Sequence, residues 1–177
     1  MEESGRKWER ILIFAIGYRS PQKDLKMVKF IGEYVAKLDD KGRVVVPAAF
    51  KNLVGKHSEG GEISFVIRKS VFANCLDMLT YEQWDLESEK LRSRLNLYRS
   101  EDDKWFRQYM MNRALVTLDQ KVGRIIIPKA LLAKIGVNKE IVFFGNDFKI
   151  EIWAKENFGA GRMSEDDFTS LTEKLLG

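Results

Sequence analysis

An internal repeat constrains the fold of this 177-residue chain more than any other feature of its sequence. Residues 42–55 align without a gap with residues 123–136, at an offset of 81, and both segments run glycine, arginine, three β-branched residues and proline. Upstream, the Leu-Asp pair at 38–39 matches the pair at 118–119 once one extra residue is allowed in the second copy. Self-similarity of this kind indicates two copies of one small structural unit.

Each copy has the pattern of a β-hairpin followed by a short helix. Glycine at the turn can adopt a positive φ, and the β-branched residues after it favour a strand. Proline then ends that strand and suits the first position of a helix. The first copy predicts strands over 34–38 and 43–46, a helix over 48–54 and further strands over 63–68 and 75–79, and the second copy adds strands over 141–144 and 149–153.

One such unit is too small to bury both faces of its sheet, so we expect the two copies to pack together about a pseudo-twofold axis. The sequence therefore predicts an α+β fold with a connecting helical segment and a C-terminal helix. All of the β-branched residues at 44–46 and 125–127 are assigned to the core. The predicted organisation is an extension over 1–26, a first domain over 34–81, a helical connector over 82–112, a second domain over 113–156 and a C-terminal helix over 157–177.

The first 26 residues read as a poorly ordered extension. Their apolar run, residues 11–18, is far shorter than the roughly 20 residues that a membrane span needs. Basic residues precede the run as in a signal peptide, but no small-x-small cleavage site follows it. We expect no association with membranes, and the alternative that the native chain starts at Met27 stays open.

Composition excludes several classes of protein. The 45% hydrophobic and 32% charged residues are typical of a folded globular chain, and a net charge of +4 does not by itself indicate a nucleic-acid partner. A single cysteine, Cys75, and a single histidine, His57, leave no disulfide framework and no multi-cysteine zinc site. Phosphate-loop, dinucleotide and zinc-protease motifs are also missing from the sequence. We therefore predict no enzymatic activity, catalytic residue, metal, cofactor or small-molecule substrate.

The repeated pattern L-D-x-K-G-R followed by three β-branched residues and proline resembles the MraZ family. The resemblance covers Met27 to about Phe158. The family's Asp-x-x-x-Arg motif is intact from Asp39 to Arg43, whereas the second copy has four residues between aspartate and arginine, so its turn is expected to bulge or to shift the register. The resemblance implies two AbrB-like swapped-hairpin β-barrel repeats in each chain.

The same resemblance implies a function. Members of the family are sequence-specific transcriptional regulators of the division and cell-wall gene cluster, which includes their own promoter. They bind direct repeats in double-stranded promoter DNA as a closed ring of identical subunits. For this chain we accordingly expect a homo-oligomer in the cytoplasm, associated with the nucleoid. Repression is the expected outcome, and activation stays open.

Physical chemistry favours the turn residues as the contacts to DNA. A glycine turn would project the following arginine from the sheet, and guanidinium suits phosphate or the O6/N7 edge of guanine. Lysine is a compact charge that suits phosphate, and the aspartate can orient the arginine by accepting its hydrogen bond. The predicted DNA-binding residues are Arg43, Lys41, Asp39, Arg124 and Lys121.

Two alternatives remain. The AbrB-like fold also serves antitoxin-type modules, which bind a toxin with a disordered tail; the helix-like pattern over 164–176 argues against such a tail. A ring that binds only proteins is the other alternative. Loss of operator binding by an Arg43→Ala variant that still assembles would favour the regulator.

Overall fold

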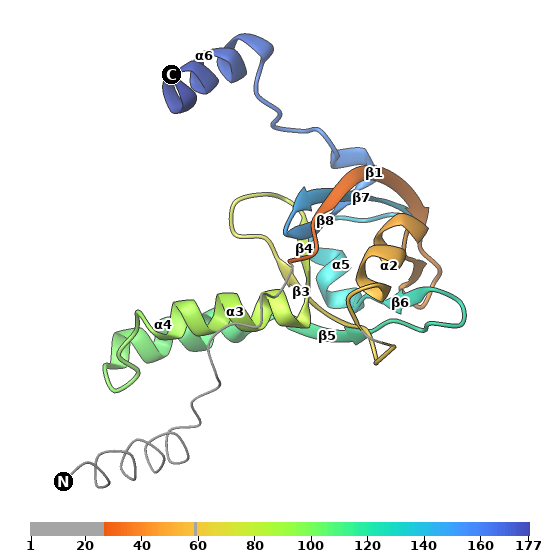
Figure 1. Ribbon diagram of the computed structural model, residues 1–177, viewed down its shortest axis with the longest axis horizontal. Helices are drawn as coiled ribbons and strands as arrows, with labels where there is room; N and C mark the ends of the chain where they lie inside the picture. Colours follow the sequence, from red (N-terminus) through yellow and green to blue (C-terminus); the bar gives the residue numbers. More distant parts are fainter. Residues whose placement is uncertain (1–26, 59) are drawn as a thin grey trace, which may run out of the picture.

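The computed structural model describes residues 27–58 and 60–177, so the predicted N-terminal extension lies outside the described residues. Within them the fold is mixed α and β, with antiparallel sheets and several helices (Figure 1). The strands are β1 (Phe30–Lys37), β2 (Arg43–Val45), β3 (Ser64–Lys69), β4 (Leu76–Thr80), β5 (Arg113–Thr117), β6 (Arg124–Ile126), β7 (Glu140–Asp147) and β8 (Lys149–Ala154). The helices are α2 (Ala48–Gly55), α3 (Tyr81–Arg92), α4 (Ser100–Met110), α5 (Lys129–Lys134), the 3₁₀ turn η1 (Lys155–Asn157) and α6 (Glu165–Leu176).

The two repeats interleave in one sheet. The main sheet has the order β1-β7-β8-β4-β3-β5, and every neighbouring pair is antiparallel. Strand β1 of the first repeat pairs with β7 of the second, and the equivalent strand β5 of the second repeat pairs with β3 of the first. Strands β2 and β6, which occupy the same place in the two repeats, pair with each other. The hairpin that the sequence predicts within each copy is therefore wrong: among the described residues, β1 does not pair with β2, nor β5 with β6, because each of these strands pairs with a strand of the other repeat.

A single core lies between the main sheet, the β2–β6 pair and the two short helices. Both repeats contribute to it, and the ring of Phe50 from α2 packs edge-on against Phe30 and Tyr34 of β1, at centroid distances of 5.4 and 5.1 Å. Helix α5, which occupies the same place in the second repeat as α2 in the first, contributes Leu131 and Leu132 to this core. Because residues of both repeats form one apolar cluster, neither repeat buries its apolar surface without the other.

Polar contacts attach the helical connector to the outer face of the sheet. Arg68 of β3 pairs with Glu87 of α3, and the hydroxyl of Tyr109 in α4 donates to Glu87 at 2.7 Å. The guanidinium of Arg113 lies 3.7 Å from the centroid of the Tyr109 ring. Although burial opposes its charge, the hydrogen bonds from Arg68 and Tyr109 hold the pKa of Glu87 below its usual value. The connector is thus joined to β3 and β5 by charged contacts.

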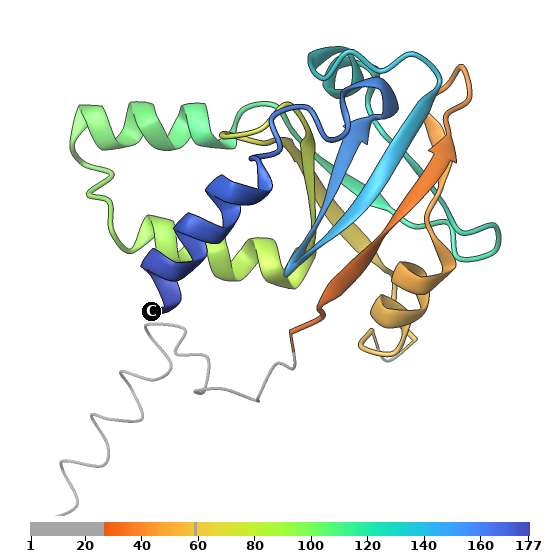
Figure 2. The same cartoon turned by 90° about the horizontal axis from the view of Figure 1, so that it is seen from above.

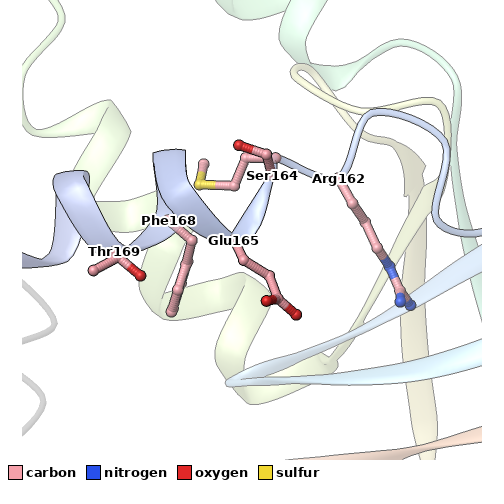
Figure 3. Close-up of a pocket in the computed structure, with 6 residues that line it drawn as sticks. Arg162, Ser164, Glu165, Phe168 and Thr169 are labelled. Carbon is pink, nitrogen blue, oxygen red and sulfur yellow. The ribbon is translucent and has the colours of Figure 1, made fainter.

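Helix α6 extends away from the sheet (Figure 1). Ser164 caps it by accepting a hydrogen bond from the Asp167 N–H at 3.1 Å, and none of its residues is buried. A hollow lies beside its first turn, lined only by the local segment 162–169; Figure 3 shows Glu165 and Phe168 extending to the same side of the helix. Among the described residues, every helix is too short or too polar to cross a bilayer.

Two boundaries predicted from the sequence differ from the structure. The first short helix, predicted over 48–54, includes Gly55 as its last residue, and Gly55 has no positive φ, whereas Gly136 follows α5 with a φ of +67°. The first strand begins at Phe30 rather than at residue 34, because the core packs against Phe30 and extends the β1–β7 ladder to it.

Candidate nucleic-acid interface

Two glycine turns lie at one end of the molecule, on the side away from α3 and α4 (Figure 2). One turn joins β1 to β2 and the other joins β5 to β6; their glycines, Gly42 and Gly123, have φ values of +78° and +72°. The Ile127 N–H donates to the Gly42 carbonyl, and the Val46 N–H donates to the Gly123 carbonyl, both at 2.9 Å. Each turn is therefore hydrogen-bonded to the strand end of the other repeat.

Asp39 organises the first turn. One carboxylate oxygen accepts the backbone N–H groups of Lys41 and Arg43, both at 2.9 Å. The other oxygen accepts the Arg43 Nε–H at 2.5 Å. The Arg43 N–H, with the Arg43 side chain and the Lys41 N–H, holds the pKa of Asp39 below its usual value, so the carboxylate is charged at neutral pH. The contact between Asp39 and Arg43 that the sequence predicts is present, and it fixes the direction of the guanidinium.

The second turn accommodates its extra residue without a shift of the ladder. The Asp119 N–H donates to the Arg124 carbonyl at 2.8 Å, as the Asp39 N–H does to the Arg43 carbonyl at 3.1 Å, so the same pair closes both turns. The Asp119 carboxylate accepts the N–H groups of Lys121 and Val122. Among the described residues no carboxylate pairs with Arg124. Of the two outcomes that the sequence predicts, a bulge or a shift of register, the structure has the first: the extra residue enlarges the turn and leaves the register unchanged.

Strands β2 and β6 form a two-stranded ribbon between the turns. Arg43 lies opposite Ile126, and Val45 lies opposite Arg124. Because side chains alternate along a strand, these four side chains share one face of the ribbon. The two arginines stand diagonally across that face, as the pseudo-twofold relation requires.

The outer face of this ribbon corrects the prediction that all six β-branched residues are core. Val44 and Ile125 are buried at 1% exposure, whereas Val45 is 54% exposed and Ile126 is 58% exposed. A ribbon of two short strands can cover only one of its faces with the core. The other face carries two arginines and two aliphatic side chains to the surface.

Three lysines lie in or beside the turns that flank the ribbon. Lys41 and Lys121 are exposed in the two turns, where the sequence predicts them. Sequence analysis missed Lys51 of α2, whose Nζ lies 3.3 Å from the point where a Cβ on Gly123 would stand. Lys51 belongs to the first repeat and Gly123 to the second, so only the interleaving of the repeats brings them together.

A buried cluster on the opposite side of the sheet has the residue types of a metal or thiol site. Potential ligand atoms of Cys75, Asp77 and Glu151 lie within 4.8 Å of one another. The Lys149 ammonium, however, is 2.8 Å from Asp77 and 3.2 Å from Glu151 and already balances both carboxylates. Burial raises the pKa of Cys75 to about 12, so its thiol is protonated at neutral pH and is a poor ligand and nucleophile. The geometry favours a structural ion-pair network.

Comparison with known proteins identifies relatives of this chain. The model of the MraZ protein family, described as antitoxin-like, matches residues 110–176. Transcriptional regulator MraZ of Bacteroides thetaiotaomicron is 38% identical over 150 residues, which cover 85% of this chain and 94% of that protein. The chain belongs to the MraZ family. Transcriptional regulator MraZ of Bacteroides fragilis is 37% identical over 150 residues (85% and 92% coverage), and that of Clostridium tetani is 31% identical over 146 residues (82% and 96%).

Proposed function

We propose that this protein is a DNA-binding transcriptional regulator that holds double-stranded promoter DNA against the β2–β6 ribbon and its two turns. One observation carries the proposal: the ribbon presents Arg43 and Arg124 diagonally on one exposed face, between two lysine-bearing turns. The relatives' name, transcriptional regulator, supports the same role.

Strands β2 and β6 form a two-stranded ribbon, and the major groove of B-DNA admits a ribbon of this kind. Arg43 and Arg124 then reach phosphate oxygens or guanine edges, while Lys41 and Lys121 neutralise phosphates. Asp39 contacts no DNA in this arrangement; it orients Arg43 through the bond at 2.5 Å and so lowers the entropy that the arginine loses on binding. Lys51 adds a further positive charge beside the second turn.

The finer features belong to the same proposal. The interleaved pairing of β1 with β7 and of β5 with β3 supports two AbrB-like swapped-hairpin repeats over 34–81 and 113–156. We infer that identical chains close into a ring that binds direct repeats upstream of the division and cell-wall gene cluster, with repression as its outcome at the nucleoid. Exposed apolar side chains support self-association; they include Phe72, Tyr98, Phe168, Leu171 and Leu175. A ring multiplies weak contacts into avidity.

The test is binding to the DNA immediately upstream of the protein's own gene. Arg43→Ala should lower affinity by about fivefold to a hundredfold, since a bidentate arginine contact is worth about 1–3 kcal/mol. Arg99→Ala is the matched control, because it removes the same charge from the exposed start of α4, away from the ribbon. Light scattering shows whether both variants keep the oligomeric state of the wild type.

Three outcomes separate the candidates. Selective loss of binding in Arg43→Ala, with assembly unchanged, supports the regulator. If Arg43→Ala and Arg99→Ala bind the operator with equal affinity, the ribbon is not the DNA-binding surface. Binding through phosphates should tighten as the salt concentration falls. If the wild-type oligomer does not bind this DNA at either low or physiological salt, the protein-binding alternatives are favoured.

A further inference from the structure

The exposed aliphatic residues of the ribbon require an explanation. Val45 and Ile126 are more than half exposed, while the residues directly before and after each of them are buried. They occupy equivalent positions in the two repeats, so the same unusual choice occurs twice. A polar β-branched residue such as threonine would serve the strand equally well at a solvent-facing position.

Each of these two aliphatic residues lies next to an arginine on the outer face of the ribbon. Ile126 lies directly opposite Arg43, and Val45 lies directly opposite Arg124. Directly opposed residues of an antiparallel pair have Cβ atoms about 4.5–5.5 Å apart. Each aliphatic side chain therefore stands beside an arginine of the other repeat, and whatever the arginines bind, the aliphatic side chains approach as well.

We propose that Val45 and Ile126 are specificity-determining residues that contact the C5-methyl groups of thymines in the major groove. This inference rests on the proposed function and deepens it. The thymine methyl is the apolar group on the base edges of the major groove, so it is the partner that an aliphatic side chain can select there. Cytosine at the same position offers no methyl group, and contact with the phosphates would favour a polar side chain.

The spacing adds a prediction about the operator. Successive bases of one strand rise by about 3.4 Å, which is less than the distance between opposed side chains on the ribbon. An arginine and the aliphatic residue opposite it therefore reach base pairs that are the same or close neighbours. The operator should contain a thymine within about two base pairs of each guanine that an arginine contacts.

The experiment replaces thymidine by deoxyuridine, which keeps the base pair and removes only the methyl group. Each thymidine of the DNA region that the protein protects is replaced in turn, and affinities are measured for the wild-type oligomer. Loss of one buried methyl contact should weaken binding about fourfold. The Val45→Ala and Ile126→Ala double variant should bind the thymidine and deoxyuridine DNAs with nearly equal affinity, because alanine lacks the γ-carbons that extend from the ribbon toward the methyl.

A matched control is the Ile31→Ala and Val35→Ala double variant, which shortens two exposed aliphatic residues on β1, away from the ribbon. It should keep the wild-type preference for thymidine. Circular dichroism shows whether each variant is folded, and light scattering shows whether it keeps the oligomeric state of the wild type.

The outcomes are distinguishable. Loss of the thymidine preference in the ribbon variant alone supports the inference. If wild type binds the operator but no deoxyuridine replacement changes its affinity, the inference is overturned while the proposed function stands. The same holds if the ribbon variant loses its oligomeric state or keeps the preference, because the two residues then act elsewhere. A wild type that does not bind the operator overturns the proposed function itself.

Discussion

Replacing the turn glycines by alanine tests how the two repeats are joined, and the structure predicts different costs at three positions. Gly42, Gly123 and Gly136 have nearly the same positive φ, from +67° to +78°. An L-residue in this conformation costs about 1–2 kcal/mol, and alanine regains about 0.4–1 kcal/mol by restricting the unfolded chain. From the backbone conformation alone, alanine at each of the three sites should lower the free energy of unfolding by about 1 kcal/mol.

The space around each glycine makes the difference. A Cβ at Gly136 meets no atom within 4 Å, and one at Gly123 meets the flexible end of Lys51 at 3.3 Å. A Cβ at Gly42 would lie 2.5 Å from the backbone oxygen of Ile127, which cannot move without disturbing the hydrogen bond from Ile127 N–H to Gly42. Losing that bond and distorting the ribbon adds about 1–3 kcal/mol at Gly42 alone.

The assay is urea-induced unfolding of the three alanine variants at one protein concentration, since association couples to stability. The expected order of destabilisation is Gly136 least, Gly123 similar or slightly larger and Gly42 largest, at about 2–4 kcal/mol. If Gly42→Ala were as stable as Gly136→Ala, the close contact between the first turn and the strand end of the second repeat would be refuted.

Two further predictions concern ionisable groups, the partly buried Glu87 and the buried Cys75. Glu87→Gln should destabilise the protein at pH 7 by about 1–3 kcal/mol, because it weakens the ion pair with Arg68. The pKa of Glu87 is lower in the folded than in the unfolded chain, so its charge stabilises the folded state above the unfolded pKa. This stabilisation is lost as pH falls through the folded pKa. Urea unfolding should therefore show that the difference in stability between Glu87→Gln and wild type shrinks below about pH 4.5. Cys75, with its pKa raised to about 12, should resist thiol reagents at pH 8 in the native protein and react in denaturant; rapid stoichiometric labelling of native protein would contradict the buried position.

The local features of each repeat were predictable from the sequence. The turn and the short helix depend on contacts within a few residues, so glycine and proline at fixed spacing indicate them. β-Branched residues indicate a strand but not its partner, which lies in the other repeat for β1, β2, β5 and β6. The bond between Asp39 and Arg43 belongs to the same class, because both residues lie within one turn. Residues 164–176 also follow this rule, since Ser164 caps α6 as an isolated sequence signal predicts.

The position of each residue relative to the other repeat could not be predicted in the same way. Lys51 gives no local sign that it will lie beside Gly123, because that contact joins residues far apart in the chain. Alternation assigns residues to the two faces of a strand only where apolar and polar types alternate, and three β-branched residues in a row carry no such signal. The core therefore selects which of them are covered, and it leaves Val45 and Ile126 at the surface beside the arginines.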